Sequence, residues 1–116
     1  MKKLFIIGSA ALSVFICANC GSSKKAASDA PKLSYEANVQ TAITENCSPC
    51  HIPSKGGNKR PYDNYANVKS DIDEIIRRIN LNPGERGFMP MRKQTKLSDS
   101  TIAVFTKWKA DGLLEK

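Results

Sequence analysis

The chain has 116 residues, of which 41% are hydrophobic, and it carries 18 Lys and Arg against 11 Asp and Glu. This size allows one small domain with appendages, and the hydrophobic content is too low for a bundle of membrane-spanning helices. The net charge of +7 raises the question of nucleic-acid binding. The basic residues are scattered, however, with no arginine-rich helix and no interleaved aromatic residues, which argues against nucleic acid as a partner.

The first 19 residues have the pattern of a signal peptide. Lys2 and Lys3 form a positive start, and residues 4–16 form an apolar segment. Cys20 follows it, in a setting that resembles a bacterial lipoprotein signal. We therefore expect an exported protein, periplasmic or on the outer membrane, which a lipid on Cys20 tethers to the membrane. An ordinary secretory peptide with an unrelated cysteine stays the alternative. Residues 20–34 are small and polar and predict a lipid-anchored, flexible linker before a domain at 35–116.

The segment Cys47-Ser48-Pro49-Cys50-His51 reads C-x-x-C-H, the signature of covalent haem c attachment. Two thiols at this spacing lie on one side of a helical turn and can form thioethers with one porphyrin. His51 then lies where its imidazole can bind the iron from one face. The alternatives are a dithiol redox site and a zinc site. A zinc site needs about four ligands, whereas the chain has one His and its other two cysteines are in the N-terminal segment.

Hydrophobic spacing and capping residues predict helices along the rest of the chain. A first helix begins after Ser34 and runs into Cys47, and a short helical turn covers residues 62–68. The clearest helix covers residues 71–80, where four isoleucines recur at helical spacing. A last helix is capped by Ser98 and ends before Gly112. Breaker-rich loops at residues 52–61 and 82–87 separate these elements.

The loop Phe88-Met89-Pro90-Met91 supplies two candidates for a second axial ligand to the iron. A thioether is a soft ligand that favours reduced iron and raises its reduction potential. Met89 precedes a proline, which restricts it to extended backbone and helps to project its side chain from the loop. Met91 lacks this feature, so the sequence favours Met89 over Met91. The bland alternative is that both methionines fill gaps in the core.

The combination of a helix into C-x-x-C-H, a Met89-Pro90 pair and a last helix with Trp108 before Gly112 resembles a monohaem class I cytochrome c. The resemblance implies an all-α cytochrome c fold, with about four to five short helices wrapped around one covalently bound haem c. It also implies that a proline of the loop after His51 supplies a carbonyl to the imidazole. Pro61 fits by its spacing, with Pro53 as the alternative. Trp108 becomes a candidate for packing against the haem.

The function that this resemblance implies is one-electron transfer with His51 and Met89 as axial ligands, not enzyme catalysis. Two alternatives stay open: a haem enzyme or gas-binding haem protein with an open iron site, and a binding or scaffold lipoprotein with an incidental dithiol. Basic residues in the two loops beside the expected haem could steer an acidic redox partner or could simply be solvated. They are Lys55, Lys59, Arg60, Arg86, Arg92, Lys93 and Lys96.

Overall fold

The first helix begins at the residue that the sequence predicts. The Ser34 hydroxyl accepts a hydrogen bond from the Ala37 N–H at 3.3 Å and so caps the helix start. The first turn is a wider π-helix, Tyr35–Val39, and it continues directly as α1, Gln40–Asn46, which ends with Cys47 as its C-cap. The prediction of one helix from Ser34 into Cys47 is therefore confirmed, with a π-helical first turn that the pattern did not indicate.

The computed structural model describes residues 30–116, and these are helical, with one isolated bridge between Ser34 and Leu114. A 3-10 turn, Pro53–Lys55, follows α1, and α2 spans Tyr65–Ser70. The last two helices are α3, Ile72–Asn80, and α4, Asp99–Ala110. The predicted signal peptide, Cys20 and most of the predicted linker lie outside the described residues. None of the described helices is long and apolar enough to cross a membrane.

The caps and the isoleucine stripe behave as the sequence predicts. Ser98 accepts a hydrogen bond from the Thr101 N–H at 3.2 Å, and Gly112, at φ 101°, follows the end of α4. In α3, Ile72, Ile75 and Ile79 are buried. Burying an aliphatic side chain stabilises the folded chain by roughly 1.5–3 kcal/mol. The described part of the chain thus confirms the all-α prediction.

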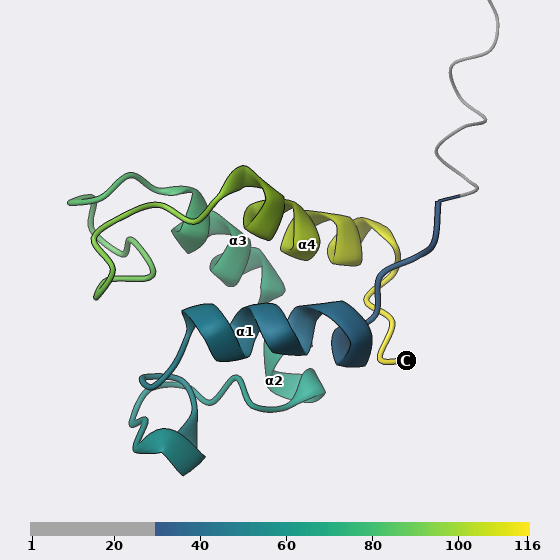
Figure 1. Cartoon of the computed structure of the whole chain (residues 1–116), viewed down its shortest axis with the longest axis horizontal. Coiled ribbons are helices and arrows are strands. Elements are labelled where there is room, and N and C mark those ends of the chain that lie inside the picture. Colours follow the sequence, from purple (N-terminus) through teal and green to yellow (C-terminus); the bar gives the residue numbers. More distant parts are fainter. Residues whose placement is uncertain (1–29) are drawn as a thin grey trace, which may run out of the picture. The chain divides into compact units, whose positions relative to one another are not determined.

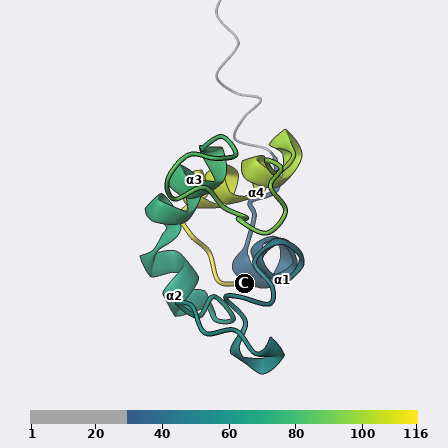
Figure 2. The ribbon, with the colours of Figure 1, turned by 90° about the vertical axis from the view of Figure 1, so that its left-hand side faces the viewer.

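Figures 1 and 2 show how the helices are arranged. In both views α3 and α4 lie together on one side, with α1 and α2 below them. The loop that follows α1 and the loop between α3 and α4 lie at the same end of the domain. The C-terminus lies near the beginning of α1, at the opposite end (Figure 1). The two ends of the domain are therefore formed by different segments of the chain.

The end that contains the C-terminus is closed by hydrogen bonds between the tail and the first helix. The Tyr35 N–H donates to the Leu114 carbonyl at 2.8 Å, and the Trp108 indole N–H donates to the same carbonyl at 2.8 Å. The Tyr65 hydroxyl donates to the Leu113 carbonyl at 2.8 Å. We call this group, Tyr35, Tyr65, Trp108 and residues 113–114, the clasp. Its three rings have centroids 5.8–6.2 Å apart, so they also pack on one another.

Candidate functional site

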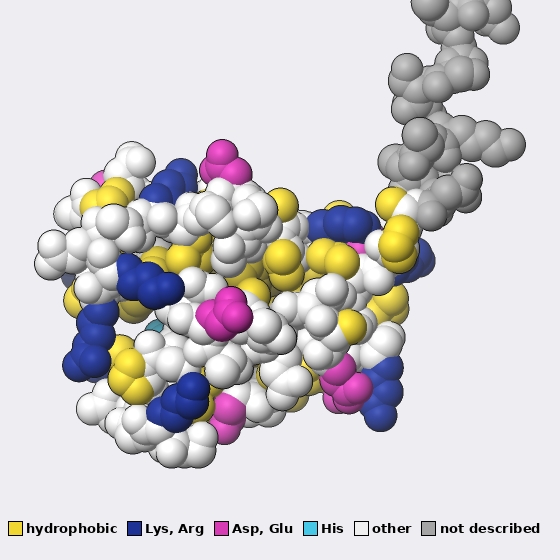
Figure 3. Space-filling view, in the orientation of Figure 1, with side chains coloured by type: hydrophobic (Ala, Val, Ile, Leu, Met, Phe, Trp, Pro, Cys, Tyr) yellow, Lys and Arg dark blue, Asp and Glu magenta, His cyan; other side chains and the backbone are white. Residues whose placement is uncertain are grey.

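The other end of the domain carries the C-x-x-C-H segment on one loop and Met89 on the other. Figure 3 shows an opening between these two parts of the molecule, and part of the side chain of the chain's single histidine (cyan) is visible at it. We call this opening, between the loop that follows α1 and the loop between α3 and α4, the hollow. Cys47 and Met89 are both partly buried and pack against the core. Residues from two distant parts of the sequence are thus placed at one end of the fold.

His51 is held with one ring nitrogen occupied. Its Nδ1 lies 2.7 Å from the Arg60 carbonyl oxygen. A carbonyl oxygen can only accept, so Nδ1 carries a proton, and in the neutral ring Nε2 then has the lone pair. The backbone repeats the link in the other direction, since the Tyr62 N–H donates to the His51 carbonyl at 2.9 Å. This is the tautomer that a metal-binding imidazole needs when it binds through Nε2.

The carbonyl that reaches His51 belongs to Arg60, which corrects the prediction of Pro61 by one residue. Pro53, the alternative, starts the 3-10 turn. The Tyr62–His51 backbone hydrogen bond sets the alignment of the loop, and this alignment presents the Arg60 carbonyl to the ring. Pro61 still acts indirectly, because a proline restricts the backbone of the residue before it.

Tyr62 and Asp71 extend this arrangement, and the sequence did not predict their contacts with His51 and Arg60. The Tyr62 ring lies flat on the His51 imidazole, with centroids 4.5 Å apart and planes 8° apart. Asp71 accepts hydrogen bonds from the Tyr62 hydroxyl at 3.3 Å and from Arg60 Nε at 3.0 Å. Burial and then the nearby Asp71 carboxylate raise the pKa of Tyr62 to about 12. No spacing pattern could reveal these pairs, since they depend on the path of the loop.

The two thiols are free in the described structure, and the turn that carries them is tightly packed. Burial raises the pKa of Cys47 to about 11, although the Lys93 charge partly opposes the shift. Cys47 is therefore a thiol at neutral pH, unlike the low-pKa cysteine of a reactive dithiol site. A Cβ on Gly57 would clash with the carbonyl oxygens of Pro49 and Cys50. Only glycine fits this contact between the loop and the turn.

The two methionines differ in burial. Met89 packs against the core, and its N–H donates to the Arg78 carbonyl at 3.3 Å. Met91 is 66% exposed. Their loop is also tied to the end of α1, because Lys93 Nζ donates to Asn46 Oδ1 at 2.9 Å. Of the two methionines, Met89 is the one whose backbone and side chain are fixed on the body of the domain.

Trp108 lies in the clasp, away from the loop of Cys47 and His51. It is fully buried, and its ring packs with Tyr35 and Tyr65. Its indole N–H donates a hydrogen bond to the Leu114 carbonyl. These contacts explain the burial of Trp108, and packing against a haem stays a prediction.

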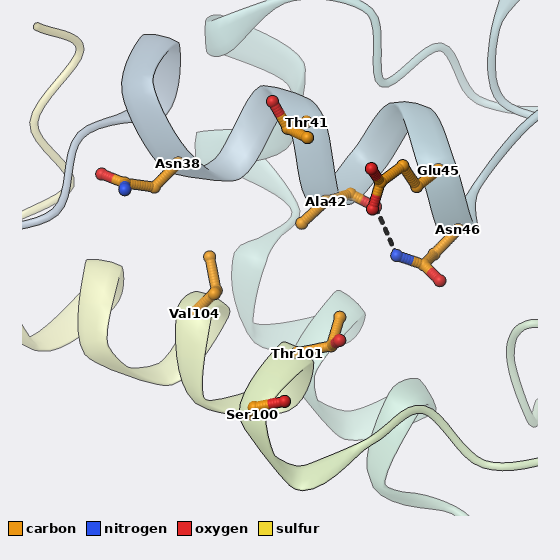
Figure 4. Close-up of a pocket in the computed structure, with 8 residues that line it drawn as sticks. All are labelled: Asn38, Thr41, Ala42, Glu45, Asn46, Ser100, Thr101 and Val104. Carbon is orange, nitrogen blue, oxygen red and sulfur yellow. Dashed lines mark hydrogen bonds between the residues drawn. The ribbon is translucent and has the colours of Figure 1, made fainter.

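Two pockets are found on the domain, and the second lies in the loop between α3 and α4, which also borders the hollow. One, of about 290 Å³, lies between α1 and α4 and is lined mainly by short polar side chains such as Thr41 and Ser100 (Figure 4). The other, of about 620 Å³, is formed by residues 83–88 with Met91 and Gln94. Neither pocket is lined by Cys47, His51 or Met89. Over residues 30–116, no three His, Cys, Asp or Glu side chains gather into a group that could hold a metal ion.

No protein-family model, no curated protein and no solved structure matches this chain.

Proposed function

We propose that this protein carries one covalently attached haem c and transfers single electrons outside the cytoplasmic membrane. Cys47 and Cys50 would bind the haem through thioethers, and His51 and Met89 would be the axial ligands of its iron. The all-α domain at residues 35–116 would then be a cytochrome c fold. When bound, the group would supply a metal centre that changes oxidation state by one electron.

One observation carries this proposal: the Nδ1–H of His51 donates to a carbonyl at 2.7 Å, directly after two free thiols. This leaves Nε2 as the nitrogen of the imidazole that can bind a metal. A hydrogen bond at Nδ1 fixes the tautomer and makes the ring a better metal ligand. Two thiols, an imidazole nitrogen and a thioether are together the donor set that a haem c requires, so the residues present fit the group.

The chain's own residues would set the properties of the iron. The Met89 thioether favours reduced iron, while the hydrogen bond from His51 to Arg60 increases the basicity of the imidazole. The tie between Lys93 and Asn46 holds the methionine loop against α1 and would limit the access of water and small ligands.

The basic residues of the two loops indicate which class of protein would be the redox partner. Lys and Arg side chains border the hollow in Figure 3, and Lys55, Lys59, Arg86, Arg92 and Lys96 are all exposed. We expect an acidic redox partner to be attracted to this rim, with a rate that falls as salt rises, because exposed charges are screened over about 8–10 Å. Association rates that stay constant from low to high ionic strength would reduce the rim to a solvated surface.

The decisive test is the absorption spectrum of full-length protein produced in a bacterium that attaches haem c in its periplasm. We expect one covalent haem with sharp low-spin bands and a far-red band from methionine on ferric iron. A high-spin spectrum would instead support a haem enzyme or gas-binding protein with an open site. A folded protein without haem would overturn the proposal and favour a binding or scaffold lipoprotein.

The lipid anchor is a separate part of the proposal and has its own test. Cys20 would become the first residue of the mature protein and carry the acyl chains, which tether the domain to an inner or outer membrane. Each buried CH₂ contributes about 0.8 kcal/mol, so more than one chain gives a stable anchor. Mass spectrometry of the mature N-terminus decides it, since an unmodified start at another residue excludes lipidation and leaves the haem proposal intact.

A further inference from the structure

The imidazole of His51 is contacted on its edge and on its face by two residues of one loop. The Arg60 carbonyl accepts from Nδ1 at the edge, and the Tyr62 ring covers one face with the planes only 8° apart. A carbonyl oxygen accepts hydrogen bonds over a broad range of directions, so the edge contact alone leaves the ring some freedom to turn. A ring stacked flat on the face removes much of that freedom.

A single carboxylate holds both of these contacts in place. Asp71 accepts from Arg60 through Nε at 3.0 Å and Nη2 at 3.4 Å, and from the Tyr62 hydroxyl at 3.3 Å. Asp71 itself is fixed at the junction of α2 and α3, where its N–H donates to the Asn67 carbonyl and its carbonyl accepts from the Ile75 N–H. The side chain of Asp71 is 25% exposed and that of Arg60 is 51% exposed, so the Tyr62 end of this network is the more buried one.

We propose that Tyr62, Arg60 and Asp71 form a clamp that fixes the plane of the His51 imidazole. Tyr62 and Asp71 are then positioning residues for the proposed axial ligand, and the inference rests on the proposed function. An imidazole bound through Nε2 can rotate about its bond to the metal. Its plane decides which iron d orbital overlaps with the ring, and therefore sets the magnetic anisotropy of the ferric state.

The clamp separates two roles of Tyr62. The stacked ring restricts rotation directly, whereas the hydroxyl only connects Tyr62 to Asp71. A tyrosine that merely covers apolar surface would contribute to stability and leave the orientation of the imidazole unchanged. The clamp instead predicts that removing the ring alters the ferric spectrum in a protein that still binds haem and keeps both axial ligands.

The test compares full-length ferric holoproteins by the proton NMR shifts of the four haem methyl groups, which depend on the imidazole plane. We expect Tyr62→Leu to change the order or the spread of these resonances, and Tyr62→Phe, which keeps the ring, to leave them near the wild type. The matched control is Tyr65→Phe, which removes a tyrosine hydroxyl in the clasp and should change nothing in this spectrum. A wild-type methyl pattern in Tyr62→Leu would overturn the clamp.

Asp71→Asn provides a second measurement if Tyr62→Leu fails to fold. This substitution weakens the hydrogen bonds that Arg60 donates to residue 71, while the Tyr62 ring remains. The Nδ1 proton of His51 should then exchange with solvent about tenfold faster in the reduced protein, as expected for loss of one charge-assisted hydrogen bond. Unchanged exchange would show that Asp71 does not support the imidazole. If the wild type and all the variants fold but none of them acquires haem, the proposed function fails. That result is distinct from failure of the clamp.

Discussion

At one end of the described domain the C-terminal tail closes on the first helix, while at the other end two loops face each other across a hollow. In the clasp, backbone carbonyls of residues 113 and 114 accept from Tyr65, Tyr35 and Trp108. At the end that carries the hollow, the thiols of Cys47 and Cys50 are free and the Nδ1 of His51 is hydrogen-bonded to the Arg60 carbonyl. The chain's own side chains and carbonyls complete the clasp, whereas the other end would be completed by the haem proposed above.

This difference indicates that the two ends of the domain have different roles. The 87 described residues form a core of modest size, so a crosslink or a bound metal would contribute a large share of the stability of the domain. The clasp gives the domain a closed end without a cofactor. The proposed haem would fill the other end and connect α1 to the loop of Met89. Changes at the two ends should therefore have different consequences.

The largest effect is expected from removing both thiols. Cys47→Ser with Cys50→Ser should abolish covalent haem and leave a poorly folded chain, because the hollow then lacks its proposed central plate. Haem staining of a denaturing gel and thermal melting followed by circular dichroism would measure this. Ser48→Ala, between the two cysteines, is the control and should keep haem. A helical, cooperatively melting double variant would show that the clasp and core suffice alone.

Trp108→Ala should have the largest effect at the clasp. It removes a fully buried indole and its hydrogen bond to Leu114, so the free energy of unfolding should fall by about 3–5 kcal/mol. If the two ends are as separate as proposed, the reduction potential should stay near the wild type. Denaturant unfolding and a redox titration of the same samples test both points. A large potential shift would instead support the packing of Trp108 against the haem.

Met89→Ala should change the reduction potential of the iron more than the free energy of unfolding, in contrast to Trp108→Ala. Loss of the thioether should lower the reduction potential on the order of 0.1 V, out of the roughly 0.8 V that axial ligands span. For one electron this equals about 2.3 kcal/mol. The far-red band should disappear, and small ligands should bind the iron. Met91→Ala is the matched control, since Met91 is 66% exposed and should change little. The reverse pattern would make Met91 the ligand.

The sequence predicted the parts of this structure that depend on local spacing. Ser34 and Ser98 cap their helices, and Gly112 lies at positive φ after α4, because capping and helix ends are decided within a few residues. The burial of the α3 isoleucines was equally predictable, since residues that recur with a period of 3.6 lie on one face of a helix.

Contacts that depend on the path of a loop were not predictable from spacing. The carbonyl on His51 comes from Arg60 and not from Pro61, because one backbone hydrogen bond at Tyr62 sets the alignment of the two segments. The stacking of Tyr62 on His51 needs the same alignment. The clasp position of Trp108 depends on where the C-terminal tail returns, and a helical pattern within α4 contains no information about that.

The smallest effects are expected from two tyrosine hydroxyls of the clasp, and they test how completely it is satisfied. The Tyr65 hydroxyl donates to the Leu113 carbonyl at 2.8 Å, so Tyr65→Phe should lower the free energy of unfolding by about 0.5–1.5 kcal/mol.

The Tyr35 hydroxyl is buried, and no hydrogen-bond partner for it lies among residues 30–116. Tyr35→Phe should therefore leave the free energy of unfolding unchanged or raise it by up to about 1 kcal/mol, because it removes an unsatisfied buried group. Both variants keep the aromatic ring, so paired denaturant unfolding curves isolate the hydroxyls. Equal destabilisation by the two substitutions would show that Tyr35 also has a partner, such as a buried water molecule, and that the clasp is more completely hydrogen-bonded than the side chains alone account for.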